Sequence, residues 1–398
     1  MSKNKNKVSV DKTALLYALN AAAKVAATSP SHLTLYNNLK IQAEDGGLVV
    51  MGSNGDNLIL VRVPDEGIQA GDLQTVLIPS GIVSVISALR GDAITMSRDG
   101  NGIRMSDGIE SPKMVAVFDD SGEMIVNGET ITYSPTEFRK MPEIAPDHSV
   151  NRMTAILWQK IVSRCATVGI DNAYPGSVGI LFSGVPGELR VSTLKPPTTV
   201  MVWDVPESWG YKLVSPLRVL VPKAAAAAIP VSGSDIAFGV VGNSFFVRDW
   251  SGLWEFYCAT LAADRMPDIS PILSLPFGAE ASISAGELAR CCGIASSFML
   301  VVGEEKGQVR TGRVRLVSDG GDVTFYTASD MGEFSGTRIP AQATAGEFDV
   351  TLANAPLKAA MTCFSGDVHL EVADSFVRLV PVPDDGLRYT LAPLAAVW

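Results

Sequence analysis

The sequence repeats itself three times at the spacing of a domain. Pro142, Pro267 and Pro393 each close a β-type segment, and they lie 125 and 126 residues apart. The first two stand in near-identical hexapeptides, MPEIAP and MPDISP. A period near 130 residues is too long for a solenoid unit but matches a domain. The repeat therefore predicts three tandem domains in this chain of 398 residues: 1–147, 148–275 and 276–398.

Each third reads as two halves that share one element pattern. A helical pattern opens each third, and Asp11 is the expected N-cap of the first helix. Two strands follow, separated by a glycine-bearing turn such as Asp45-Gly46-Gly47. A second short helix, such as the alanine run 224–228, and further strands complete each third. The pattern predicts an α+β fold of βαβββ halves, with the helices on one face of antiparallel sheets.

The composition is that of a soluble globular chain, with 47% hydrophobic and 19% charged residues. No apolar run approaches the ~20 residues of a membrane span. The N-terminus lacks the apolar core of a signal peptide. Five cysteines without a CxxC pair and three widely separated histidines indicate reduced thiols and no metal site. We therefore expect a cytoplasmic protein without a cofactor or a membrane partner.

The motifs of common enzyme classes are missing from the sequence. It contains no P-loop, no HExxH and no Gly-x-Ser-x-Gly, and no GxGxxG loop follows an expected strand. Asp92, Asp235 and Asp367 recur once per domain at strand starts, where aspartate commonly makes turn hydrogen bonds. A shared pair of catalytic carboxylates is not expected, so the chain is predicted not to be an enzyme.

Charge is distributed unevenly between the expected helices and the rest of the chain. The helices, taken as 11–27, 80–90, 151–168, 222–229, 284–297 and 353–362, carry nine basic residues but only two acidic ones, in a chain of net charge −10. Surface helices often carry lysine and arginine, but they normally carry glutamate as freely. We predict a shared cationic face that contacts phosphates without reading bases, inside an acidic exterior. The predicted DNA-facing residues are Lys12, Lys24, Arg90, Arg152, Lys160, Arg164, Lys223, Arg290 and Lys358.

Several segments, in order and at matching spacing, resemble the bacterial sliding clamp, the beta subunit of the replicative DNA polymerase. The segment ADRMPDI at 263–269 is similar to the family's Asp-Gly-Arg-Phe-Pro-Asp-Tyr, and YTLAPL at 389–394 resembles the family's C-terminal ending. The resemblance implies a homodimeric ring in which twelve helices line a hole for duplex DNA. It further implies a processivity factor that tethers a DNA polymerase, that an ATP-driven clamp loader opens, and that has no catalysis of its own.

The resemblance also implies a groove that takes short peptides from polymerases and other partners. Its expected walls in this chain are Val178, Thr193, Pro267, Ile272, Thr390, Pro393 and Leu394. The family position of Phe298, Met299 and Leu300 implies the dimer interface. Strand-end packing for the groove residues, and ordinary core packing for 298–300, are the alternatives.

The chain departs from the family where the family shows Thr-Asp-Gly-His-Arg-Leu. It reads TLKPPTT at 193–199 instead, which suggests a diverged partner motif and a phage or mobile-element clamp serving its own polymerase. The alternative function is a structural β-rich protein of tandem domains, such as a phage particle component that does not encircle DNA. That alternative explains the repeats but not the charge distribution.

Overall fold

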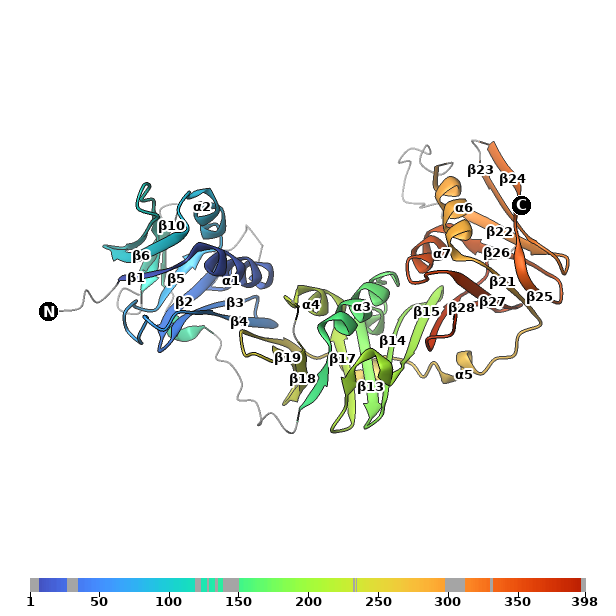
Figure 1. The fold of residues 1–398 in the computed structure, drawn as a ribbon, viewed down its shortest axis with the longest axis horizontal. Coiled ribbons are helices and arrows are strands. Elements are labelled where there is room, and N and C mark those ends of the chain that lie inside the picture. The colour runs from blue at the N-terminus through green and yellow to red at the C-terminus, as the bar shows by residue number, and fades with distance from the viewer. Residues whose placement is uncertain are drawn as a thin grey trace. The chain divides into compact units, whose positions relative to one another are not determined.

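The computed structural model divides the chain into two compact units (Figure 1). Unit 1 comprises residues 1–155 and 224–260, and unit 2 comprises residues 156–223 and 261–398. The structure describes residues 7–26, 35–118, 123–126, 129–132, 135–138, 150–231, 233, 235–297, 312–329 and 332–394. Each unit is taken by itself below.

Unit 1 combines antiparallel strands with short helices. Its helices are α1 (Lys12–Val25), α2 (Ile82–Ala88) and all but the first residue of α4 (Lys223–Ala228), with 3-10 turns η1 (Leu35–Asn37) and η2 (Pro135–Glu137). Its strands are β1 (Lys7–Asp11), β2 (Asn38–Glu44), β3 (Gly47–Ser53), β4 (Asn57–Pro64), β5 (Val76–Pro79), β6 (Ala93–Asp99), β7 (Gly102–Ser106), β8 (Lys113–Val115), β9 (Val117–Phe118), β10 (Glu123–Val126), β11 (Glu129–Thr132), β12 (Asn151–Met153), β18 (Ile236–Val241), β19 (Ser244–Asp249) and β20 (Trp254–Ala259).

Unit 2 has the same character. Its helices are α3 (Ala155–Ala166, from its second residue), α5 (Ser270–Leu273), α6 (Ala285–Ser297) and α7 (Asn354–Met361), with 3-10 turns η4 (Pro175–Val178), η5 (Glu207–Trp209) and η6 (Ala263–Arg265). Its strands are β13 (Gly179–Val185), β14 (Glu188–Lys195), β15 (Thr199–Val205), β16 (Tyr211–Lys212), β17 (Leu217–Pro222), β21 (Ala279–Ser284), β22 (Arg313–Ser318), β23 (Val323–Ser329), β24 (Gly332–Ile339), β25 (Ala341–Ala345), β26 (Phe348–Ala353), β27 (Asp367–Ala373), β28 (Phe376–Val382) and β29 (Leu387–Leu391).

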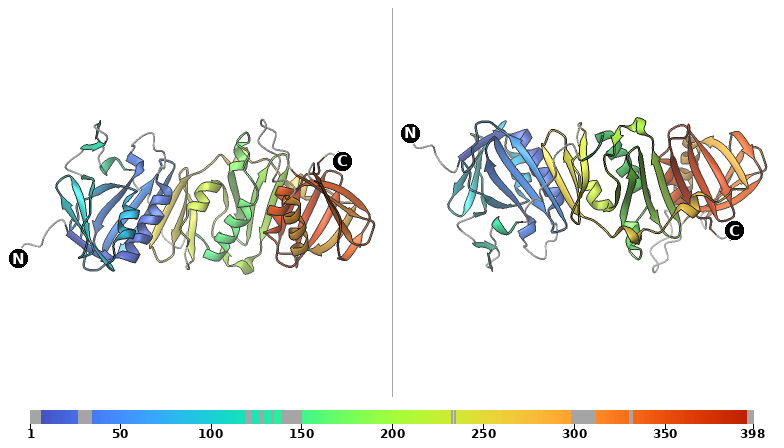
Figure 2. Two further views of the ribbon diagram at one scale, coloured as in Figure 1. Left: turned by 90° about the horizontal axis from the view of Figure 1, so that it is seen from above. Right: turned by 90° about the horizontal axis from the view of Figure 1, so that it is seen from below.

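Every described strand pair is antiparallel, and strands from distant parts of the sequence join in one sheet. In unit 1 the strands follow the order β12-β18-β19-β20-β4-β3-β2-β5-β9 in one sheet and β1-β6-β7-β8 in another. In unit 2 the orders are β17-β13-β14-β15-β29-β28-β27-β21-β25 and β24-β23-β22-β26. Two pairings have the same place in the repeat: β4 with β20 in unit 1, and β15 with β29 in unit 2. Sheets of this kind, with helices on one side, confirm the expected α+β class (Figure 2).

The six expected helices lie where the sequence places them, with two differences at their ends, and the short helix α5 was not expected. Asp11 is the N-cap of α1, because its carboxylate accepts a hydrogen bond from the Ala14 amide at 2.8 Å. Arg152, however, lies on strand β12 and not on a helix, since α3 begins only at Ala155. Arg90 lies beyond the end of α2. Both differences arise because amphipathic spacing does not mark the residue at which a helix starts or stops.

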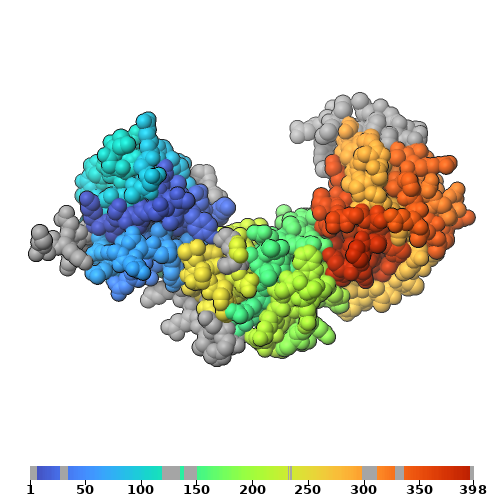
Figure 3. All heavy atoms as spheres, in the orientation of Figure 1, coloured from blue at the N-terminus to red at the C-terminus, as the bar shows by residue number. Residues whose placement is uncertain are grey.

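Apolar side chains fill the space between helices and sheets in each unit. Figure 3 shows the outer atoms that enclose these cores, coloured along the chain. In unit 1 the helix α1 packs directly on β3, and Gly52 permits this approach because a Cβ there would collide with the Ala22 carbonyl. In unit 2 the fully buried Trp158 of α3 stacks on Phe182 of β13, with ring centroids 5.6 Å apart. The side of each helix that faces away from the sheet is therefore the side left for other contacts.

Candidate nucleic-acid and peptide interfaces

Two of the predicted DNA-facing lysines bind the end of a neighbouring helix. Lys12, the first residue of α1, donates to the carbonyls of Ser87 and Leu89 at the end of α2. Lys223, the first residue of α4, is 8% exposed and donates from Nζ to the carbonyl of Val168 at 2.7 Å, just past the end of α3. The last carbonyls of a helix carry partial negative charge, so a cation there is stabilising. These two ammonium groups are C-caps of neighbouring helices.

The same contact recurs in the last third of the chain with an uncharged donor. Asn354, the first residue of α7, donates its amide to the Cys292 carbonyl and the Ser296 hydroxyl near the end of α6, both at 3.1 Å. Lys358 lies one turn further along α7, is exposed, and donates to the same Ser296 hydroxyl at 3.1 Å. Part of the basic bias of the helices therefore reflects helix capping.

The three basic residues between 152 and 164 each contact a tryptophan. The Arg152 guanidinium lies 2.9 Å from the ring centre of Trp250. The Lys160 ammonium lies 3.7 Å from that of Trp209. Cations over an indole face are attracted by its quadrupole. Burial, with Arg164 nearby, lowers the pKa of Lys160 below its usual range.

Arg164 is enclosed in the protein. Its side chain is only 5% exposed, its guanidinium lies 4.1 Å from the ring centre of Trp203, and Nη2 donates to the Asp385 carboxylate at 2.6 Å. This placement corrects the expectation for Arg164, and the burial of Lys223 corrects it likewise, because neither cation reaches the surface. Burial also lowers the pKa of Lys223 to about 8.

The remaining predicted cations are exposed. Lys24 lies in the last turn of α1, and Arg90 follows α2. Arg290 on α6 is half-exposed and pairs with Glu287 one turn earlier, with 2.9 Å between Nη2 and Oε2. An exposed pair of this kind contributes little stability and leaves the guanidinium accessible. Together with Lys160 and Lys358, these residues form the cationic set that can reach a phosphate: Lys24, Arg90, Lys160, Arg290 and Lys358.

The predicted groove residues lie around one part of unit 2, which we call the partner surface (Val178, Thr193, Pro267, Ile272, Thr390, Pro393 and Leu394). Val178 ends η4, which packs against η6: a Cβ on Gly176 would lie 2.7 Å from the Arg265 carbonyl oxygen. Pro267 lies two residues after the end of η6 and is exposed. This contact brings the first and middle parts of the partner surface together.

Thr193 and Thr390 lie on neighbouring parts of the same sheet but are buried. The Thr193 hydroxyl donates to the Gly179 carbonyl at 3.0 Å and thereby ties β14 to β13. Thr390 pairs across the sheet with Val200 on β15 and with Arg378 on β28. Ala392 donates from its amide to the Thr198 carbonyl, which holds the end of β29 beside the turn after β14. The half-buried Pro393 and Leu394 follow.

Sequence reasoning missed Arg378, which connects Ile272 to this sheet. Arg378 is 6% exposed, donates from Nη1 to Glu371 at 2.7 Å, and from Nη2 to the Ile272 carbonyl at 2.8 Å. Its Nε and the Thr390 hydroxyl are buried without a hydrogen-bond partner. A single arginine in the apolar strand FVRLVPV was the available signal, because a buried charge needs a partner.

The corresponding positions on the paired strands of unit 1 carry aromatic and larger aliphatic side chains. Leu58, Tyr257 and Phe246 occupy the row that Val200, Thr390 and Arg378 occupy in unit 2. Phe138, four residues before Pro142, is buried against this face and contacts the Tyr36 ring edge-on at 6.0 Å. The residue four before Pro267 is only an alanine. The aromatic groups that fill the unit 1 face are thus replaced by smaller or polar groups at the partner surface.

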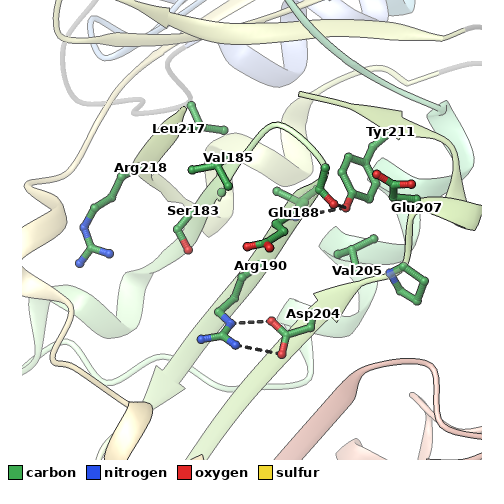
Figure 4. Close-up of a pocket in the computed structure, with 14 residues that line it drawn as sticks. Ser183, Val185, Glu188, Arg190, Asp204, Val205, Glu207, Tyr211, Leu217 and Arg218 are labelled. Atoms are coloured by element: carbon green, nitrogen blue, oxygen red, sulfur yellow. Dashed lines mark hydrogen bonds and ion pairs between the residues drawn. The ribbon is translucent and has the colours of Figure 1, made fainter. Parts of the chain in front are cut away.

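A separate hollow of about 700 Å³ lies on unit 2 at the β13–β14 turn (Figure 4). Its lining includes the apolar Val185 and Leu217 beside the exposed Arg190–Asp204 ion pair, whose closest N–O distance is 2.5 Å. None of the partner-surface residues lines it. Tyr211 donates to the Gly187 carbonyl and fixes this edge of the hollow.

Four further expectations concern groups other than these surfaces. Phe298, Met299 and Leu300 lie outside the described residues. Within the described ranges, no group of three histidine, cysteine or carboxylate side chains could hold a metal ion. No helix in the part that the structure describes is long and apolar enough to span a bilayer. Burial raises the pKa of the Cys165, Cys292 and Cys363 thiols, which disfavours their reactive thiolate forms.

Comparison with known proteins identifies the fold. No protein-family model and no curated protein matches the sequence. Solved structures match it over nearly its whole length. The DNA polymerase sliding clamp from Bacillus subtilis matches with a TM-score of 0.83 at 13% identity, over 99% of this chain and 100% of that one. The beta subunit from DNA polymerase of Streptococcus pyogenes gives 0.82 at 13% identity, over 98% and 100%.

A third solved structure matches nearly as well. The DNA polymerase III beta subunit from Thermotoga maritima gives a TM-score of 0.79 at 13% identity, over 98% of this chain and 100% of that one. The chain therefore has the DNA sliding-clamp fold. More particularly, its fold is that of DNA polymerase III beta subunits, at only 13–14% sequence identity.

Proposed function

We propose that this protein is a DNA sliding clamp, a processivity factor without catalysis of its own. Two copies, each folded as three domains (1–147, 148–275 and 276–398), close into a ring around duplex DNA. The observation that carries the proposal is the match to DNA polymerase sliding clamps along the whole chain, at TM-scores up to 0.83. A clamp loader opens the ring and a replicative polymerase is held on it, in the cytoplasm of a bacterium or in the service of a phage.

The exposed cations, together with the half-buried Lys160, are the proposed phosphate contacts. Lys24, Arg90, Lys160, Arg290 and Lys358 carry positive charge in a chain of net charge −10. They are few and separated, so each contributes a weak contact that ions from solution can replace. Contacts of this strength allow a ring to move along DNA, while the closed ring prevents dissociation. The acidic remainder of the molecule repels DNA from other surfaces.

The partner surface is the proposed attachment point for the polymerase. Its support is the register comparison: unit 1 carries Tyr257 and Phe246 where unit 2 carries Thr390 and Arg378. The smaller or polar side chains in unit 2 favour a peptide site there and not at the equivalent place in unit 1. The turn 195–198, where the chain departs from bacterial clamps, adjoins this surface and fits a diverged partner motif.

Light scattering tests the proposed assembly. A closed ring of two 42.1 kDa chains has a mass of about 84 kDa, and particle images of it show a central hole. The mass should stay constant over a tenfold dilution above the dissociation constant. A monomer at all concentrations, or an open polymer that grows with concentration, would contradict the ring and favour a structural role.

A further inference from the structure

A tryptophan ring holds the ammonium group of Lys160 on unit 2. Nζ of Lys160 lies 3.7 Å from the ring centre of Trp209, and the face of an indole attracts a cation. No carboxylate of the described residues forms an ion pair with this ammonium. Asp385, whose charge acts on Lys160 from a longer distance, already binds Arg164 at 2.6 Å. The positive charge of Lys160 is therefore held in place without being neutralised.

The ring of Trp209 is itself fixed by its backbone and by a second ring. The short turn η5 that carries Trp209 ends at Gly210, whose φ of 78° lies in the left-handed region that favours glycine. The Trp209 ring stands edge-on to the fully buried Trp203, with ring centroids 5.7 Å apart. Trp203 in turn donates from its indole nitrogen to the Asp385 carbonyl at 2.9 Å. Trp209 thus offers Lys160 a fixed aromatic face.

Lys160 lies near the side of α3 that faces away from the sheet. Ile156, one turn earlier, is 70% exposed, whereas Leu157 and Ile161 are fully buried. A lysine has a flexible four-carbon stem, so fixing its ammonium for a contact costs conformational entropy. A carboxylate partner would lower that cost but would also offset the attraction of the cation for an anion. An uncharged ring lowers the cost and leaves the attraction intact.

We propose that Trp209 is a positioning residue for a contact between Lys160 and a DNA phosphate. The inference rests on the proposed function, in which Lys160 is one of the phosphate contacts. The ring lies against one side of the ammonium, and the N–H groups on its other side donate to the phosphate oxygens. Such a contact carries no sequence information, so the contribution of Trp209 is the same on every DNA sequence. Trp209 acts through Lys160 and not by touching DNA.

A double-mutant cycle tests the coupling between the two side chains. Fluorescence anisotropy measures the affinity of the full-length protein for a short fluorescein-labelled duplex at pH 7 and several salt concentrations. Lys160→Met should weaken binding about fivefold at low salt and lower the slope of log affinity against log salt by about 1 per lost contact. Trp209→Leu should weaken binding about threefold, but should have no further effect in the Lys160→Met background. Trp209→Phe, which keeps an aromatic face, should retain most of the wild-type affinity.

The matched control is a second cation beside an aromatic ring in unit 2. The Arg315 guanidinium lies 5.9 Å from the ring centre of Tyr326, but it is paired with the Asp349 carboxylate. Tyr326→Leu should therefore leave the affinity for the duplex unchanged. Melting temperatures establish that the variants are folded. If Trp209→Leu loses the fold, Trp209→Met takes its place, because methionine can pack on Trp203 without supplying an aromatic face.

Three outcomes would overturn the role of Trp209. Wild-type affinity of Trp209→Leu, beside weakened binding by Lys160→Met, shows that Lys160 needs no ring. Additive losses in the double variant show that Trp209 acts independently of Lys160, and a Trp209→Phe variant as weak as Trp209→Leu assigns the effect to packing. The clamp proposal fails separately: equal retention of the wild type on circular and cut DNA refutes encirclement even where Trp209 and Lys160 are coupled on the duplex.

Discussion

The buried Arg164–Asp385 pair gives the sharpest test of how this chain uses its basic residues. The side chain of Arg164 is 5% exposed and that of Asp385 is 23% exposed, with 2.6 Å between Nη2 and Oδ2. The other guanidinium nitrogens of Arg164, Nε and Nη1, are buried without hydrogen-bond partners. Asp385 is therefore the chief counter-charge for a cation that solvent hardly reaches.

Asp385→Ala leaves this cation buried and unpaired. Removal of one partner of a buried ion pair costs about 3 kcal/mol of unfolding free energy. Because Asp385 is partly exposed and water can enter its place, we expect a loss of about 2 kcal/mol. The Trp203 indole donates to the backbone carbonyl of Asp385, so that bond survives the substitution. The matched control is Asp349→Ala at the exposed Arg315–Asp349 pair, which should cost less than about 1 kcal/mol.

The second substitution, Arg164→Met, removes the unpaired positive charge. In the Asp385→Ala background it should restore part of the lost stability, because no unpaired cation remains and the methionine side chain can pack on Trp203. Urea unfolding at pH 7, followed by circular dichroism, measures all four members of the cycle. Equal costs for Asp385→Ala and Asp349→Ala, or a further loss on adding Arg164→Met, would refute this account of Arg164.

Three further perturbations test other parts of the structure. The pKa of Lys223 is about 8 in the folded protein and about 10.5 in the unfolded chain, so between these values only the unfolded chain holds the proton. Unfolding free energy should rise with pH there by up to about 1.4 kcal/mol per unit, and a Lys223→Met variant, compared by urea titrations at pH 8 to 10, should lack this slope. Phe138→Ala should cost about 3 kcal/mol by opening the unit 1 core, and a loss below about 1 kcal/mol in urea unfolding would contradict its burial. Reversal of Lys24 and Arg90 to glutamate should weaken DNA retention and reduce its salt dependence while leaving the melting temperature unchanged; unaltered retention would remove these residues from the DNA contacts.

The repeated fold was predictable because its signals are local. Strand-ending prolines, glycine turns and helical spacing each depend on a few neighbouring residues, and Asp11 caps α1 as its sequence context indicates. The uncertain points were the helix ends, since Arg152 has a suitable neighbourhood for a helix but pairs with Ala237 on a strand. Pairing partners so distant in the chain leave no mark in a local pattern.

The roles of the basic residues were much less predictable. The sequence places Lys160 and Arg164 about one helical turn apart, but it does not show that the Trp203 ring lies against the Arg164 guanidinium. Likewise, nothing near Lys12 in sequence indicates that its ammonium binds the carbonyls of Ser87 and Leu89. A charge count over helices therefore overestimated the cationic surface, because cations that cap a neighbouring helix look the same in sequence as cations that face solvent.

Retention on circular DNA tests the central claim most directly. Protein at high concentration is mixed with a nicked circular plasmid, so that rings reassemble around it, and the complex is passed through a sizing column in 0.3 M salt. We predict that the protein elutes with the circle and separates from it after a single restriction cut lets the ring slide off the ends. Equal retention on circular and cut DNA, or no retention on either while the 84 kDa assembly persists, would contradict encirclement.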